Sequence, residues 1–80
     1  MAKEQTQLQT AFGEILRDLR NKVGFSQEKL ALDCGLDRTY ISLLERGLRQ
    51  PTLTTLFTLA NSLGIKPSNL IKSVETELKS

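Results

Sequence analysis

The stretch Gln27–Arg46, QEKLALDCGLDRTYISLLER, constrains the fold more than any other part of the chain. It predicts a short helix, a sharp turn at Gly35 and a second short helix over Arg38–Arg46. The second helix has apolar residues along one side and hydrogen-bonding residues along the other. A helix of this kind buries its back against the rest of the protein and presents polar side chains outward.

The two sides of the second helix follow from the helical period of about 100° per residue. Tyr40, Ile41 and Leu44 fall on an apolar arc that faces the core. The residues on the opposite, outer arc are Arg38, Thr39, Ser42, Leu43 and Arg46. Leu43 is the apolar exception on this outer arc, and Glu45 lies at the border between the two arcs.

Length and composition exclude several classes of protein. The chain has 80 residues, which corresponds to one domain, residues 1–80, with an ordered core expected over about 8–78. It has one cysteine, Cys34, and no histidine, so neither a disulfide nor a metal site is expected. An enzyme is not expected either, because an activated nucleophile and a glycine-rich phosphate loop are also missing, and no cofactor is predicted. Without a long apolar run or an apolar signal sequence, the chain is expected to be cytoplasmic and not bound to a membrane.

Charge is distributed unevenly along the chain. Residues 1–37 contain five Lys or Arg and six Asp or Glu, whereas residues 38–74 contain five Lys or Arg and a single acid, Glu45. The positive charge therefore collects in and after the second motif helix. A polyanionic partner would suit this distribution, although an ordinary solvated surface would also show it.

Hydrophobic periodicity and capping residues predict an all-α fold of five helices, with no strand signal. The expected helices are Leu8–Lys22, Gln27–Cys34, Arg38–Arg46, Leu53–Leu63 and Pro67–Leu78. Ser26, Asp37 and Thr52 are the expected N-caps, and the polar residues before Leu8 are expected to be frayed. The fourth-helix residues expected to point inward are Leu53, Leu56, Phe57, Ala60 and Leu63.

Seven positions in Gln27–Arg46 fit the pattern of a known motif. They are the apolar residues Leu30, Cys34, Leu36, Ile41 and Leu44, the small residue Ala31 and the turn residue Gly35. With Ser-Gln at its start and an arginine-rich loop behind it, the segment resembles the helix-turn-helix of lambda-repressor-like regulators, of the Cro and xenobiotic-response-element types. The resemblance covers about Leu8–Leu78. The stretch LDRTYIS also resembles restriction–modification controller proteins.

The resemblance implies a sequence-specific regulator whose second motif helix lies in the major groove of double-stranded DNA. Arg38, Thr39 and Ser42 would contact base edges, and Leu43 either meets a thymine methyl group or is simply exposed. The residues expected at backbone phosphates are Gln27, Tyr40, Arg46, Arg49, Gln50 and Thr52. Tyr40 is also a candidate packing residue with its hydroxyl at the rim. In relatives, a glutamine like Gln27 additionally braces a recognition side chain.

The resemblance also implies a structural ion pair between Arg20 in the first helix and Glu45 at the end of the third. Glu45 is the acid that stands alone in the basic part of the chain. A partly buried pair of this kind orients two helices more than it adds stability. Loss of one partner would leave the other charge unpaired.

One recognition helix reads only a few base pairs, so a homodimer on a short palindromic operator is expected. The expected dimer surface comprises Ile65, Ile71, Val74 and Leu78, unless these residues only close the core of the protomer. The alternative function is an antitoxin or protein-interaction adaptor built on the same motif. Such a protein would carry large apolar anchors on the outer arc, where this chain has arginine, threonine and serine.

Overall fold

The computed structural model describes the backbone of residues 2–79 and the side chains of residues 7–79. The helices of this part of the chain are α1 (Ala2–Val23), α2 (Gln27–Cys34), α3 (Arg38–Glu45), α4 (Leu53–Leu63) and α5 (Pro67–Leu78). The predicted all-α fold of five helices is confirmed, and α2, α4 and α5 have the predicted bounds. Over the residues described, none of the helices combines the length and hydropathy needed to cross a membrane.

The first helix is longer than its apolar pattern predicts. Its backbone is helical from Ala2, six residues before Leu8. The reason is that the first residues include good helix formers and no proline or glycine. Apolar periodicity reports only the part of a helix that packs on a core, and here that part begins at Leu8.

Local capping bonds define the ends of α2. The hydroxyl of Ser26 accepts the backbone N–H of Lys29 at 3.0 Å. At the other end Gly35 takes the left-handed conformation, with φ of 67°, and Leu36 N–H returns to Ala31 O at 2.9 Å. The N-cap predicted for α3 is only half right. Asp37 has the extended N-cap backbone, but its side chain makes no capping hydrogen bond.

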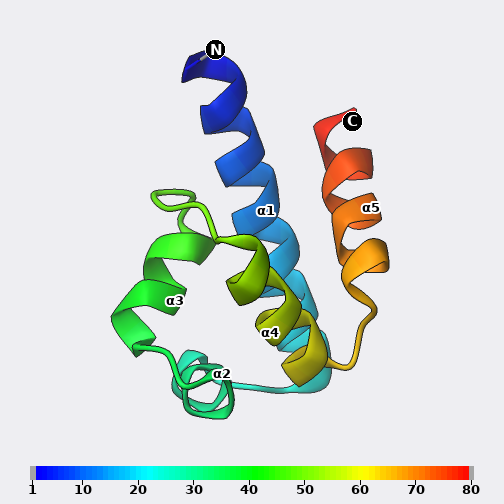
Figure 1. Ribbon diagram of the computed structural model, residues 1–80. Coiled ribbons are helices and arrows are strands. Elements are labelled where there is room, and N and C mark those ends of the chain that lie inside the picture. The colour runs from blue at the N-terminus through cyan, green and yellow to red at the C-terminus, as the bar shows by residue number, and fades with distance from the viewer. Residues whose placement is uncertain (1, 80) are drawn as a thin grey trace.

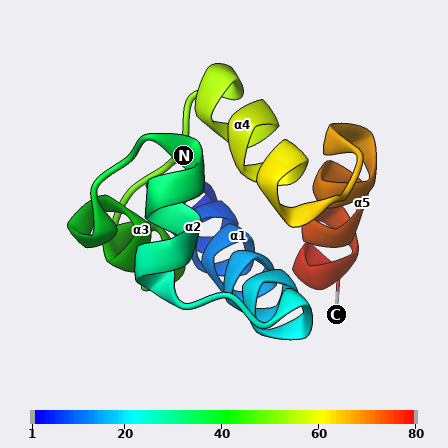
Figure 2. The same cartoon turned by 90° about the horizontal axis from the view of Figure 1, so that it is seen from below.

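The helices surround α1, which packs against α3, α4 and α5. The pair α2–α3 lies on one side of α1 and α5 lies on the other, as two perpendicular views show (Figure 1, Figure 2). The helix α4 packs against α2 and α5 and completes the enclosure. The largest fully buried side chains are Leu16, Leu30, Ile41, Leu44, Leu59 and Leu70. Because all five helices contribute at least one of them, α3 is fixed relative to the rest of the protein.

Close contact between α1 and α3 depends on Gly13. A Cβ atom at this position would lie 2.5 Å from the backbone oxygen of Leu44 and 2.6 Å from that of Glu45. Glycine in the middle of a helix is about 1 kcal/mol less favourable than alanine. The backbone of α3 therefore lies against α1 at a distance that only glycine permits.

The inward face of α4 differs from the prediction. Leu53 and Phe57 are 69% and 51% exposed, whereas Leu59, which was not predicted to point inward, is fully buried. Ala60 and Leu63 are buried and Leu56 is half-buried, as expected. The sequence of α4 carries apolar residues on more than one side, and periodicity alone does not indicate which side the other helices cover.

Candidate nucleic-acid interface

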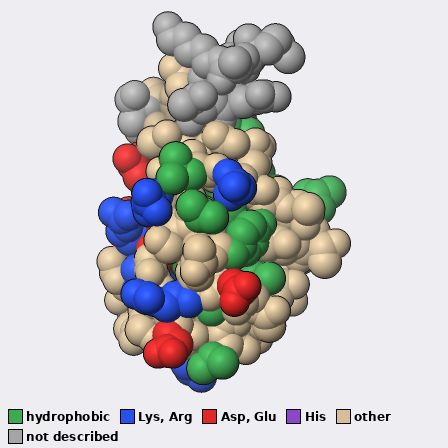
Figure 3. Space-filling view, turned by 90° about the vertical axis from the view of Figure 1, so that its left-hand side faces the viewer, with side chains coloured by type: hydrophobic (Ala, Val, Ile, Leu, Met, Phe, Trp, Pro, Cys, Tyr) green, Lys and Arg blue, Asp and Glu red, His purple; other side chains and the backbone are tan. Residues whose placement is uncertain are grey.

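The outer face of α3 is polar and accessible. Arg38 and Thr39, in its first turn, are exposed, and Ser42 and Leu43 are half-buried. Ile41 and Leu44 are fully buried on the opposite side of the helix. Figure 3 looks onto the side of the molecule formed by α3, where Lys and Arg side chains gather. The predicted division of this helix into a buried face and an outward face is therefore correct.

Two predicted contact residues on α3 are only partly accessible. Tyr40 is half-buried and packs against the core, in line with the packing alternative. Leu43 is also half-buried. Its carbonyl accepts the N–H of Leu48 at 2.9 Å, which ties the end of α3 to the loop that follows.

The loop after α3 contributes further polar groups. Arg46, Arg49 and Gln50 are exposed, and one terminal nitrogen of Arg49 donates to Leu48 O at 3.0 Å. The hydroxyl of Thr52 accepts the N–H of Thr55 at 3.1 Å as the N-cap of α4. Arg46, Arg49 and Gln50 therefore remain available to a ligand, while Thr52 is already engaged in a structural bond.

Behind the outer face of α3 lies the buried carboxylate of Glu45, which binds groups from two other helices, α1 and α2. The side chain of Glu45 is completely buried, and Arg20 donates to it twice, from Nε to Oε2 at 2.6 Å and from Nη2 to Oε1 at 3.0 Å. Arg20 also donates from Nη1 to Phe25 O at 2.7 Å. The hydrogen bond to Glu45 raises the pKa of Arg20 above its ordinary value. This is the ion pair that the sequence predicts, here as a side-on double hydrogen bond.

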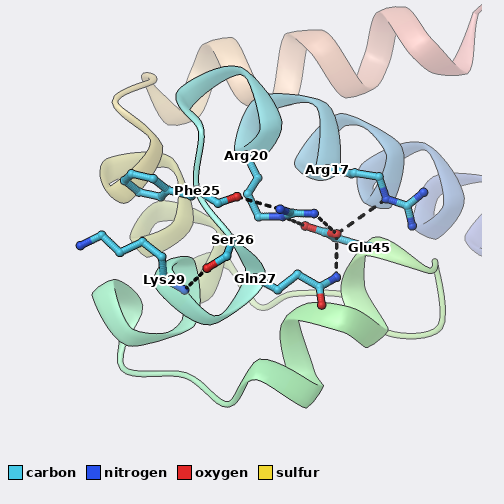
Figure 4. Close-up of polar contacts among 7 residues, drawn as sticks. All are labelled: Arg17, Arg20, Phe25, Ser26, Gln27, Lys29 and Glu45. Atoms are coloured by element: carbon cyan, nitrogen blue, oxygen red, sulfur yellow. Dashed lines mark hydrogen bonds and ion pairs between the residues drawn. The ribbon is translucent and has the colours of Figure 1, made fainter.

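Two further groups reach the same carboxylate, and sequence reasoning missed both contacts. Gln27 Nε2 donates to Glu45 Oε1 at 3.0 Å, and Arg17 Nε lies 3.7 Å from the same oxygen. Figure 4 shows the cluster of Arg17, Arg20, Gln27 and Glu45 between α1, α2 and α3. The spacing of one turn between Arg17 and Arg20 is a signal for the Arg17 contact. No local pattern indicates the Gln27 contact, because Gln27 and Glu45 meet only in the folded chain.

The bond to Glu45 also orients Gln27 toward α3. A carboxylate only accepts hydrogen bonds, so the NH₂ group of Gln27 faces it and the amide oxygen points away (Figure 4). Gln27 and Arg38 line one shallow hollow on the surface. The predicted phosphate residue Gln27 and the predicted base-reading residue Arg38 are therefore neighbours.

An apolar surface lies away from α3. Leu53 and Phe57 on α4 and Ile71 on α5 are all exposed, and a groove of about 250 Å³ between α1, α4 and α5 is lined by Leu53 and Ile71 among others. Of the residues predicted for a dimer surface, Ile71 and Leu78 are exposed. Ile65 is half-buried against the core, and Val74 is buried, with 6% of its surface exposed.

A helix pair joined by a tight glycine turn, with its second helix buried behind and exposing Arg, Thr and Ser in front, defines a helix-turn-helix DNA-binding protein. Residues 16–70 match the helix-turn-helix family. The control protein C.BamHI of Bacillus amyloliquefaciens is 44% identical over 61 residues, which cover 75% of this chain and 75% of that protein.

Two solved structures resemble the fold over most of its length. The restriction–modification controller protein C.AhdI from Aeromonas hydrophila has a TM-score of 0.75 at 45% identity and covers 78% of this chain and 94% of that one. The controller C.Esp1396I, solved as a tetramer with its natural 35-base-pair operator, has a TM-score of 0.82 at 29% identity and covers 91% of this chain and 96% of that one. The chain thus belongs to the helix-turn-helix family and is a DNA-binding transcriptional regulator, not an enzyme.

Proposed function

We propose that this regulator is of the restriction–modification controller type and binds a short, roughly palindromic operator as a homodimer. The observation that carries the proposal is the outer face of α3, where Arg38 and Thr39 are exposed above a fully buried Ile41 and Leu44. Support comes also from the similarity to C.BamHI and from the operator complex of C.Esp1396I. Because transcription regulators act on the chromosome, we place the protein in the cytoplasm, at the nucleoid.

In the proposed complex α3 lies in the major groove and its first turn reads base edges. Arg38 donates two hydrogen bonds to O6 and N7 of a guanine, which is worth about 1–3 kcal/mol of discrimination against other bases. Thr39 and Ser42 make shorter polar contacts, and Leu43 meets a thymine methyl group. The amide oxygen of Gln27, which points away from Glu45, accepts from Arg38 and steadies that side chain over the base.

Backbone contacts flank the recognition helix on both sides. At one side the N-terminus of α2 and Gln27 meet a phosphate, since free N–H groups at a helix start attract anions. At the other side Arg46, Arg49 and Gln50, all exposed, hold the phosphates of the opposite strand. Tyr40 and Thr52 contribute at the rim, with Thr52 limited by its bond to Thr55.

The second protomer covers the apolar surface of α4 and α5. This surface is formed by Leu53, Phe57 and Ile71, and Leu78 extends it along α5. Ile65 and Val74 are not part of it, because they pack mainly within the protomer. Exposed apolar patches of this kind mark protein–protein contacts. Two copies joined here present two α3 helices to half-sites about 34 Å apart, or one turn of DNA.

The test is selection of bound duplexes from a random pool by the wild type and by Arg38→Ala. The wild type is expected to enrich a two-fold symmetric motif, and Arg38→Ala to lose one base preference in each half-site without uniform weakening. Enrichment of no motif by the wild type would overturn the proposal.

Arg49→Ala provides the contrasting variant, because its side chain is proposed to meet a phosphate. It should weaken binding to all sequences alike and reduce the slope of log K against log salt by about one. A change of base preference in this variant would contradict its assignment to the backbone.

A further inference from the structure

We propose that Arg17 on α1 is a further contact to the DNA backbone, and that the buried carboxylate of Glu45 holds its guanidinium in position for that contact. The proposal rests on the DNA-binding function proposed above and adds α1 to the helices that touch the duplex. Arg17 lies outside the helix-turn-helix itself, more than 25 positions before the end of α3.

Arg17 lies close to a residue that is proposed to contact the DNA backbone. Arg17 Nε lies 3.7 Å from Glu45 Oε1, the oxygen that also accepts Gln27 Nε2 at 3.0 Å. Arg17 and Gln27 therefore approach the same oxygen atom, and the duplex backbone is proposed to pass beside Gln27. Figure 4 shows the Arg17 guanidinium with its Nε toward Glu45 and its two terminal nitrogens directed away from the cluster.

The charges of the cluster also favour an anionic ligand at Arg17. Arg20 and Glu45 form a complete pair: the side chain of Arg20 is only 12% exposed, and its donors are used on Glu45 and on Phe25 O. Arg17 is therefore a second cation beside a carboxylate that is already neutralised. Its side chain is 50% exposed. Two arginines and one glutamate leave the cluster with one net positive charge, and the accessible member carries it.

The guanidinium of Arg17 also has a shape that suits a phosphate. The two terminal nitrogens of a guanidinium form a planar fork that matches two oxygens of a phosphate. Glu45 approaches only Nε of Arg17 in this structure, so that fork is left for a ligand. Holding the side chain by Nε reduces the rotamer freedom that a phosphate contact would otherwise cost. A lysine here would supply the charge without the second point of attachment.

The experiment measures the salt dependence of binding to the duplex enriched by the wild type. Arg17→Ala is expected to weaken binding about tenfold at low salt and to reduce the slope of log K against log salt by about 0.9, the value for one phosphate. Base preference should not change. Lys72→Ala, which removes an exposed positive charge from α5, is the matched control and should keep the wild-type slope. An unchanged slope for Arg17→Ala, or an equal loss in both variants, would overturn the proposal.

Two further measurements separate a DNA contact from a purely structural role. Arg17→Ala should melt close to the wild type, because a half-exposed ion pair contributes little and Glu45 keeps Arg20 and Gln27. Arg17→Lys should keep the slope and bind about threefold more weakly, since the charge remains without the fork. A large loss of stability with an unchanged slope would make Arg17 a structural residue. If the wild type enriches no duplex, the proposed DNA-binding function is wrong. If all variants bind selectively and with equal slopes, that function stands and only the proposed role of Arg17 is wrong.

Discussion

Two sides of this small protein, the α3 side and the α4–α5 side, are both accessible. They differ in the chemistry of their side chains and in the bonds that hold them in place. The α3 side exposes arginine and threonine and has a fully buried carboxylate behind it that binds α1 and α2. The α4–α5 side exposes Leu53, Phe57 and Ile71 around an apolar groove. A surface that reads positions of hydrogen-bonding groups must be held rigidly by directional bonds. A surface that gains its energy from burial needs only a partner to cover it.

The largest effect is expected from removal of the buried carboxylate that holds the α3 side in place. Glu45→Ala should lower the free energy of unfolding by about 3 kcal/mol, because it leaves Arg20 largely buried without its partner. For a domain of this size the melting temperature should fall by more than about 10 °C. Thermal denaturation followed by circular dichroism measures it. The control is Glu75→Ala on α5, an exposed carboxylate, and equal melting of both variants would refute a special role of Glu45.

The next effect comes from the contact between α1 and α3. Gly13→Ala should destabilise the protein by about 2 kcal/mol, because the new methyl group would meet the backbone of Leu44 and Glu45. This sign is opposite to the helix preference for alanine over glycine. Chemical denaturation of Gly13→Ala beside Asn21→Ala, an exposed position of the same helix, tests it. A more stable Gly13→Ala would show that α3 can move away from α1 at no cost.

A substitution on the α4–α5 side should act on assembly and spare the fold. Phe57→Asp places a charge on the exposed apolar surface and should raise the dissociation constant of the dimer at least about tenfold, which is 1.4 kcal/mol. Sedimentation equilibrium measures the change, and the melting temperature under monomeric conditions should stay the same. Leu32→Asp is the control, since Leu32 is an exposed leucine on α2. Equal loss of dimer in both variants would contradict the proposed surface.

The smallest effect lies at the contact between α1 and α5. Glu77 shares a hydrogen bond with Glu14, and this bond, with the charges of Glu14 and Asp18, raises the pKa of Glu77 above its ordinary 4.5. A raised pKa in the folded state means that the contact stabilises below the pKa of the unfolded chain and loses that contribution as pH rises through the folded value.

Glu77→Gln should therefore increase the melting temperature slightly at pH 7 relative to pH 4, because the neutral amide keeps this position uncharged as the pH rises. Melting curves at both pH values, with Glu75→Gln as the control, measure this. A gain that is equal at both values would point to a cause other than protonation.

Much of the fold could be predicted because its signals are local. Ser26 and Gly35 mark the ends of α2 by hydrogen bonds to residues within four or five positions, and such bonds are visible in the sequence as residue types. The division of α3 into two faces follows from its helical period. The start of α1 was misplaced for the same reason, since the period reports burial and the helix continues beyond its buried part.

The errors concern which apolar residues of α4 and α5 are buried within the protomer. Leu53, Phe57 and Leu59 are equally apolar in the sequence, and only the positions of α1, α2 and α5 decide that Leu59 is buried and the other two are not. Likewise the burial of Val74 and the exposure of Ile71 depend on how α5 is rotated against α1. Periodicity predicts that a face is apolar but not whether the same chain or another copy covers it.

By itself, the sequence determined the number and type of helices, the turn at Gly35 and the outward position of Arg38 and Thr39, while the family resemblance implied the pairing of Arg20 with Glu45. These follow from short-range geometry and from a motif whose spacing is read along the chain. Only the tertiary structure decided that Gly13 brings α1 against α3 and that Gln27 and Arg17 share the buried carboxylate with Arg20. The physical reason is that contact across 18 to 32 residues depends on the packing of whole helices, which no local pattern records.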